Sequence, residues 1–176
     1  MQIIAIANHK GGVGKTTSST NIAACWGEQG KKVLLVDMDP QGSASMSLGI
    51  TSDGGDLLSA LQKSIALPVE RTKIKGVDVV PSGPSLALAR QLFTGSLGKE
   101  LLLRCIKQTP DDWDRIIIDC PPSLGVLTVT SLWASKNTVI PVETNYLALR
   151  GLNQMVEMVV SMKREHPEIE ITAIIP

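Results

Sequence analysis

A glycine-rich stretch near the amino terminus has the residue types that bind phosphate groups. Glycines let successive backbone N–H groups point at one anion, and a helix starting beside them adds the positive end of its dipole. Lys15 would reach the β- and γ-phosphates of a nucleoside triphosphate, and the Thr16 hydroxyl would ligate Mg²⁺. The predicted loop follows an entry residue, His9, and consists of Lys10, Gly11, Gly12, Val13, Gly14, Lys15, Thr16 and Thr17.

This loop departs from the general phosphate-loop pattern at its first position. The pattern places a glycine where this chain has His9, although Lys15 and Thr16 keep their places. We interpret His9 as a loop histidine that fills the vacated position. Contact of its imidazole with phosphate or with a neighbouring subunit is the alternative.

Two later segments place carboxylates directly after or at the end of apolar runs. One reads Asp37-Met38-Asp39-Pro40-Gln41-Gly42, and the other reads Arg115-Ile-Ile-Ile-Asp119-Cys120-Pro121-Pro122. Aspartates at the carboxyl ends of parallel strands can approach a γ-phosphate and its metal. We therefore predict Thr16, Asp39 and Asp119 as the metal-site residues, with a simple turn cap as the alternative for the first aspartate segment.

Hydrophobic periodicity predicts the elements that would position these residues. Apolar runs of the kind found in buried parallel strands cover 2–7, 32–36, 77–80, 115–118, 138–142 and 169–175. Helical patterns cover 16–29, 56–62, 86–93, 97–108 (the last two separated by Gly95), 124–133 and 147–165. This alternation predicts an α/β fold with a doubly wound, mostly parallel sheet and helices on both faces. The Ser/Gly-rich segment 43–55 is predicted to be a mobile active-site loop.

Length and composition limit the classes of protein. We expect residues 1–176 to form a single domain, because 43% hydrophobic and 19% charged residues are typical of a globular chain of this size. Seventeen basic residues balance seventeen acidic ones, so no strongly basic field recruits nucleic acid. Cys25, Cys105 and Cys120 match neither a zinc site nor a redox pair and are predicted to be reduced core thiols of a cytoplasmic protein.

The motifs KGGVGKTT, DMDPQG and DCPPS, with NYLALRGL further on, closely resemble the ParA/Soj partition ATPases of the ParA/MinD superfamily of P-loop ATPases. The resemblance extends over essentially the whole chain. DPQG and the entry Asn8-His9-Lys10 are more similar to ParA than to MinD, the nitrogenase iron protein or the Mrp-type carriers. In this superfamily a loop whose first glycine is replaced, with a lysine before the paired glycines, is the deviant form of the phosphate loop.

The resemblance implies an ATP- and Mg²⁺-dependent ATPase that dimerises around its nucleotide. Lys10 is then the signature lysine, which crosses a two-fold interface to the phosphates of the partner's ATP. Asp39 orients or activates the attacking water in a first switch loop, and Asp119 belongs to a second. Lys10 and Asp39 are therefore the implied catalytic residues, and hydrolysis is implied to be slow without a stimulating, ParB-like, centromere-binding partner.

Three functions remain open from the sequence. A partition ATPase would move plasmids or chromosomes and, as an ATP dimer, bind nonspecific DNA on the nucleoid. A MinD-like ATPase would position protein cargo or act on the membrane. A nucleotide-gated scaffold would bind nucleotide without turning it over. A terminal amphipathic helix for membrane anchoring is not visible. Lys136, Lys163 and Arg164 are either part of a DNA-facing patch or an ordinary solvated face, and Arg150 stands where the resemblance implies an acidic residue.

The resemblance also implies that the family's fold continues after Pro176. The following strands and helices would include the loop that recognises adenine and much of the DNA-contacting surface. We therefore expect residues 1–176 to lack the carboxyl-terminal part of the family fold, either as a truncated chain or as a naturally short relative.

Overall fold

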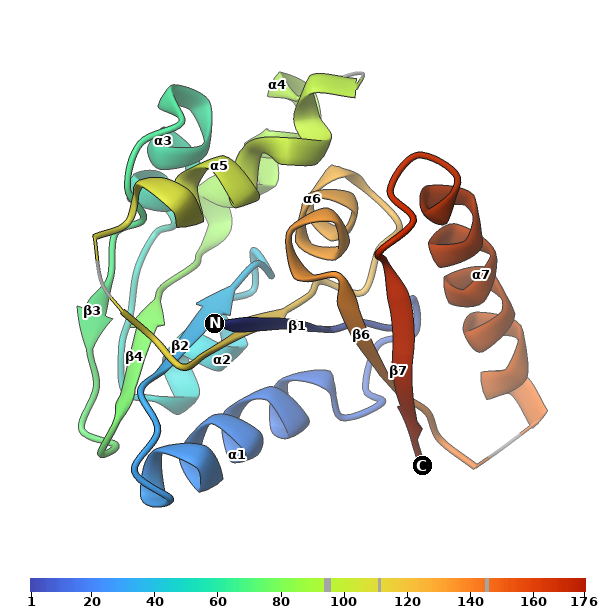
Figure 1. The fold of residues 1–176 in the computed structure, drawn as a ribbon, viewed down its shortest axis with the longest axis horizontal. Coiled ribbons are helices and arrows are strands. Elements are labelled where there is room, and N and C mark those ends of the chain that lie inside the picture. Colours follow the sequence, from blue (N-terminus) through green and yellow to red (C-terminus); the bar gives the residue numbers. More distant parts are fainter. Residues whose placement is uncertain (94–95, 111, 145) are drawn as a thin grey trace.

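A seven-stranded sheet in the order β3-β4-β2-β5-β1-β6-β7 forms the centre of the protein (Figure 1). This computed structural model describes residues 1–93, 96–110, 112–144 and 146–176, and only the backbone of 96–97 and 146–150. The strands are β1 (Gln2–Ile6), β2 (Val33–Asp37), β3 (Glu70–Arg71), β4 (Val77–Val80), β5 (Arg115–Asp119), β6 (Asn137–Pro141) and β7 (Glu170–Ile175). All neighbouring strands are parallel except β3 and β4, which form an antiparallel pair.

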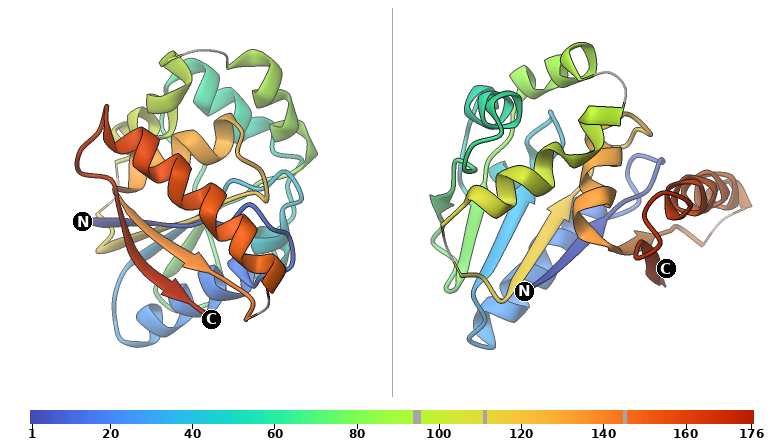
Figure 2. Two further views of the ribbon diagram at one scale, coloured as in Figure 1. Left: turned by 90° about the vertical axis from the view of Figure 1, so that its right-hand side faces the viewer. Right: turned by 45° about the horizontal axis from the view of Figure 1, so that its top comes forward.

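Helices cover both faces of this sheet (Figures 1 and 2). They are α1 (Lys15–Glu28), α2 (Ser43–Ser47), α3 (Gly55–Lys63), α4 (Ala89–Leu92), α5 (Leu101–Gln108), α6 (Val126–Ser135) and α7 (Tyr146–Lys163). One core cluster joins α1 and α2 to one face, and a larger cluster joins α3, α5, α6 and α7 to the other. The predicted doubly wound α/β fold is therefore confirmed.

The central strands are apolar because both of their sides are covered. Every residue of β2 is buried, and Ile116, Ile117 and Ile118 of β5 have no exposed surface. Their side chains alternate between the two core clusters, since successive strand residues point to opposite faces. This burial explains why the strands read as continuous apolar runs rather than as an alternating pattern.

The structure corrects the sequence predictions at several points. The six predicted strands all form, but β3 was missed because two exposed residues carry no periodic pattern. Segment 43–55 begins with helix α2, and the helical stretches 86–93 and 97–108 include the 3₁₀ turns Pro84–Leu88 and Ser96–Glu100. Gly95, predicted to separate them, lies outside the described residues. Cys105 and Cys120 are buried free thiols, whereas Cys25 is exposed, so its assignment to the core was wrong.

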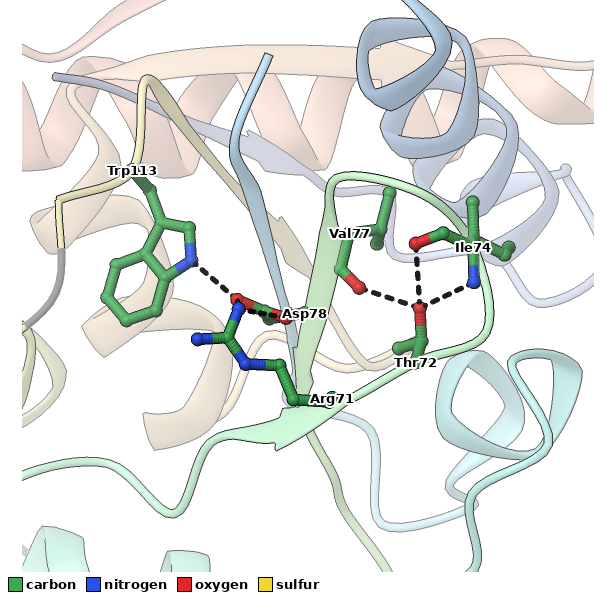
Figure 3. A network of polar contacts seen from close by, with 6 residues as sticks. All are labelled: Arg71, Thr72, Ile74, Val77, Asp78 and Trp113. Carbon is green, nitrogen blue, oxygen red and sulfur yellow. Dashed lines mark hydrogen bonds and ion pairs between the residues drawn. The ribbon is translucent and has the colours of Figure 1, made fainter. Parts of the chain in front are cut away.

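A polar network around the buried carboxylate of Asp78 connects β3 and β4 at one side of the sheet (Figure 3). The Asp78 carboxylate in β4 accepts two hydrogen bonds from Arg71 in β3, at 2.9 and 3.1 Å, and one from the indole N–H of Trp113, at 3.1 Å. The Thr72 hydroxyl donates to the Val77 carbonyl at 2.6 Å and closes the turn between the two strands. The network thus connects the edge hairpin to the segment that leads into β5.

Trp113→Phe tests the contribution of the indole hydrogen bond to this edge. The substitution keeps most of the buried ring but leaves Asp78 with one donor fewer, so we expect a loss of about 1–2 kcal/mol of unfolding free energy. Chemical denaturation monitored by circular dichroism measures it. Trp26→Phe is the control, because Trp26 packs against Arg115 without an indole hydrogen bond in the described structure, and a comparable loss there would contradict the assignment.

Candidate nucleotide-binding site

The predicted phosphate-binding loop connects the end of β1 to the start of α1. Gly12 and Gly14 adopt positive φ angles of 76° and 84°, which a side chain would disfavour, and Gly14 caps the amino terminus of α1. The entry to the loop is tied to β6, because the buried Asn8 side chain donates to the Pro141 carbonyl at 2.7 Å. The loop therefore presents backbone amides and a helix N-terminus at the carboxyl edge of the sheet, as anion binding requires.

Lys15 lies inside this loop with 7% of its surface exposed. Its ammonium donates to the Lys10 carbonyl at 2.9 Å. Burial lowers the pKa of Lys15, while the nearby carboxylates of Asp119 and Asp39 act in the opposite direction. A largely buried ammonium at the start of a helix is suited to binding an anion of high charge.

Asp119, at the end of β5, accepts hydrogen bonds from two residues of α1. The Thr16 hydroxyl donates to Oδ2 and the Ser19 hydroxyl to Oδ1, both at 2.8 Å. Burial raises the pKa of Asp119 to about 7, and Asp37 and Asp39 add to this effect. Carboxylate and hydroxyl oxygens are the donors that Mg²⁺ prefers, so Thr16 and Asp119 fit a magnesium site.

Ser19 is a site residue that the sequence analysis missed. It is fully buried, and its only sequence signal is its position about one helical turn after Lys15 and Thr16, on the same side of α1. A serine with this spacing is common in helices without any role at a site. The pairing with a strand more than ninety residues away becomes visible only in the fold.

The segment after β2 places Asp39 in a tight turn beside the loop. Its Oδ1 accepts from the Gln41 N–H at 3.0 Å, and its carbonyl accepts from the Gly42 N–H at 2.9 Å. The turn-capping role is therefore present, and Asp39 nevertheless borders the same cavity as the phosphate-binding loop. Asp37 is fully buried, and burial raises its pKa. Its carboxylate accepts hydrogen bonds from the Asp39 N–H at 3.1 Å and from the N–H and hydroxyl of Ser45.

These residues surround a cavity of about 330 Å³ at the carboxyl edge of the sheet. It is lined by Gly11, Gly12, Gly14, Lys15, Thr16, Thr17, Asp39, Ser43 and Pro122. Of the predicted loop residues, Val13 is buried and Lys10 contacts Glu143 instead. A second cavity, of about 280 Å³, lies beside Arg71 and Trp113. Neither the phosphate-binding loop nor Asp39 or Asp119 lines it.

Lys136, Lys163 and Arg164, the residues considered for a DNA-facing patch, do not line this site. Lys136 forms an ion pair with Glu168, and Lys163 and Arg164 are exposed. The His166 ring packs edge-on against Trp133 with 5.0 Å between centroids. The side chain of Arg150 lies outside the described residues. Among the helices described, none is both long and apolar enough to cross a membrane.

A glycine loop between a strand and a helix, with aspartates at the ends of two further parallel strands, defines a P-loop nucleotide-binding domain. Residues 1–171 match the profile of the family described as AAA domain. The chain is 42% identical over 171 residues to the sporulation initiation inhibitor protein Soj of Bacillus subtilis, an alignment that covers 90% of this chain and 64% of that protein. It is 38% identical over 180 residues to the chromosome partitioning protein ParA of Myxococcus xanthus, covering 99% of this chain and 64% of that protein.

A solved structure of cobyrinic acid a,c-diamide synthase from Mycobacterium smegmatis, with a bound ATP analog and magnesium, has the same fold. Its TM-score is 0.86 at 33% identity, and the match covers 99% of this chain and 72% of that one. The chain belongs to the ParA/Soj-type family of P-loop ATPases. It spans somewhat less than two thirds of the length of the Soj and ParA relatives.

The burial of Asp119 predicts a pH-dependent stability in buffer without magnesium or nucleotide. Because the folded-state pKa is raised from 3.8 to about 7, the carboxyl group favours the folded state below pH 4, and this contribution is lost as the pH rises to 7. We expect the unfolding free energy of Asp119→Asn to exceed that of the wild type by roughly 3 kcal/mol at pH 8 and by little at pH 4. Urea titrations across this range measure the difference.

Asp114→Asn is the control of opposite sign. A hydrogen bond from the Lys32 N–H lowers the pKa of this exposed carboxyl group, so its contribution is present above the usual Asp range and is lost on acidification. Removing it should lower stability slightly at pH 8. If Asp119→Asn also lowers stability at pH 8, the buried carboxylate is not a source of electrostatic strain.

Proposed function

We propose that this chain binds Mg-ATP, dimerises around the nucleotide and hydrolyses it, as a partition ATPase. The observation that carries the proposal is the meeting of Lys15, Thr16, Asp39 and Asp119 at one edge of the sheet. The ATP analog and magnesium bound to the Mycobacterium smegmatis neighbour support this choice of ligand. The name of the Myxococcus xanthus relative, chromosome partitioning protein ParA, supports the partition role.

Each residue has a distinct task in the proposed reaction. Lys15 and the backbone amides of the loop bind the phosphates and neutralise charge that builds up during transfer. The Thr16 hydroxyl and the Asp119 carboxylate would hold Mg²⁺, which supplies charge neutralisation on the phosphate oxygens. Asp39, fixed in its turn beside the cavity, orients the attacking water and accepts its proton.

Dimerisation follows from the proposed role of Lys10. This lysine would complete the nucleotide site of a second copy of the chain, so bound ATP favours the dimer by mass action and hydrolysis releases it. Slow turnover until a ParB-like, centromere-bound partner stimulates it keeps the dimer long-lived. The proposed location is the cytoplasm, on the nucleoid when the ATP dimer binds DNA.

Sedimentation with and without Mg-ATP tests the dimer proposal. We expect ATP to dimerise the wild type and Asp39→Ala, because the aspartate acts only in hydrolysis, and to leave Lys10→Ala monomeric. Phosphate release should fall at least a hundredfold in both variants. If ATP leaves every protein monomeric, or dimerises Lys10→Ala like the wild type, the model of a nucleotide shared between two subunits is wrong for this chain.

Binding assays separate the partition role from its alternatives. A partition ATPase predicts ATP-dependent binding to nonspecific duplex DNA that weakens steeply between 50 and 200 mM salt, since each phosphate contact releases counterions. Binding to anionic vesicles without DNA binding favours a MinD-like role instead. Dimerisation with ATP but without phosphate release indicates a scaffold.

A further inference from the structure

The side chain of Lys10 is bound by an acidic residue of its own chain. Its ammonium lies 2.5 Å from Oε2 of Glu143, two residues after the end of β6. Both side chains are partly exposed, at 35% and 41%. The partner of Lys10 is therefore more than a hundred residues away in the sequence, just after β6, the strand that neighbours β1 in the sheet.

The backbone of Lys10 is held in the same place from two sides. Its N–H donates to Oδ1 of Asn8 at 3.1 Å, while the Asn8 amide donates to Pro141 in β6. Its carbonyl accepts from the Lys15 ammonium at 2.9 Å. Three polar groups of Lys10, the N–H, the carbonyl and the ammonium, thus each contact a group of the same chain.

One of these contacts is made by Lys15, the residue proposed to bind phosphate. Lys15 is the residue proposed to bind the β- and γ-phosphates, and an ammonium drawn toward phosphate oxygens releases the Lys10 carbonyl. The Lys10 segment then loses this hydrogen bond when nucleotide binds, which is when the Lys10 side chain is proposed to reach the nucleotide of the second subunit. The ion pair with Glu143 is a second restraint, and because both groups are partly exposed it is weak enough to be broken.

We propose that Glu143 is a positioning residue that holds Lys10 within its own subunit and competes with the contact that Lys10 makes to the partner's nucleotide. Phosphate binding at Lys15 loosens this arrangement, and dimerisation completes the release. The inference rests on the proposed function, since it assigns a regulator to Lys10. It predicts that removal of the Glu143 charge favours the ATP dimer.

The first test measures the freedom of Lys10 directly, in the full chain without nucleotide. An amine-reactive ester labels the protein, and mass spectrometry follows the peptide that contains Lys10. We expect Glu143→Gln to raise the labelling rate of Lys10 about two- to fivefold, the range that loss of a partly exposed ion pair allows. Glu143→Asp keeps the charge and should stay near the wild-type rate.

Glu165→Gln is the matched control variant. It removes an acidic partner from a different lysine, Lys99, at 2.7 Å on another part of the surface. Labelling of Lys99 should rise while labelling of Lys10 stays unchanged. If Glu143→Gln leaves the Lys10 rate at the wild-type value, the ion pair does not restrain Lys10 and the proposal is overturned.

The second test measures the dimer by sedimentation in Mg-ATP. Glu143→Gln should dimerise at a chain concentration about two- to fivefold lower than the wild type, and Glu143→Asp and Glu165→Gln should match the wild type. Unchanged dimerisation of Glu143→Gln would show that the glutamate does not compete with the intersubunit contact. Weaker dimerisation would show that it supports Lys10 in the dimer. Either result overturns the proposal.

Lys10→Ala separates this failure from a failure of the proposed function. If Lys10→Ala still dimerises with ATP, the intersubunit role of the lysine is wrong, whatever Glu143 does. If Lys10→Ala stays monomeric while Glu143→Gln behaves as the wild type, the ATP dimer stands and only the competition by Glu143 is rejected.

Discussion

The parallel register of β1, β5 and β2 is the constraint on which the site depends. Ile6 pairs with Asp119, which in turn pairs with Asp37, so three strands end at the same level. The phosphate-binding loop and the two aspartate segments therefore start from one line across the sheet. A shift of a single residue would turn Asp119 to the opposite face, away from Thr16 and Ser19. Burial of every residue of β2, and of every residue of β5 after Arg115, fixes this register.

The same burial makes the site electrostatically unfavourable until a ligand arrives. Asp37 and Asp119 are both fully buried, and the loss of hydration raises the pKa of each carboxyl group. Hydroxyl and backbone donors offset part of the cost, while burial also lowers the pKa of Lys15. A divalent cation with a polyphosphate would supply the missing charge to both kinds of group. The buried charged groups that lower the stability of the fold without a ligand are therefore the same groups that favour binding of a ligand.

The sequence predicted the parts of this arrangement that local patterns encode. Buried strands, the glycine loop and the strand-end aspartates all have short-range signals, and their meeting at one edge follows from the parallel topology. The contacts of Ser19, Asn8 and Glu143 could not be found this way, because each of these residues pairs with a partner about a hundred or more residues away. Strand β3 was missed for a different reason, since it exists only through its pairing with β4.

The contacts of Asn8 and Lys10 connect the phosphate-binding loop to the segment that leads from β6 into α7. Asn8 bonds to Pro141 and Lys10 to Glu143. Gly151 in α7 lies beside these residues, since a Cβ there would be in ordinary van der Waals contact, 3.4 Å from Oδ1 of Asn8 and 3.6 Å from the Lys10 Cβ. A loop that moves when phosphate binds must therefore carry these contacts with it or break them. Helix α7 is therefore in direct contact with the phosphate-binding loop, and its packing depends on the position of that loop.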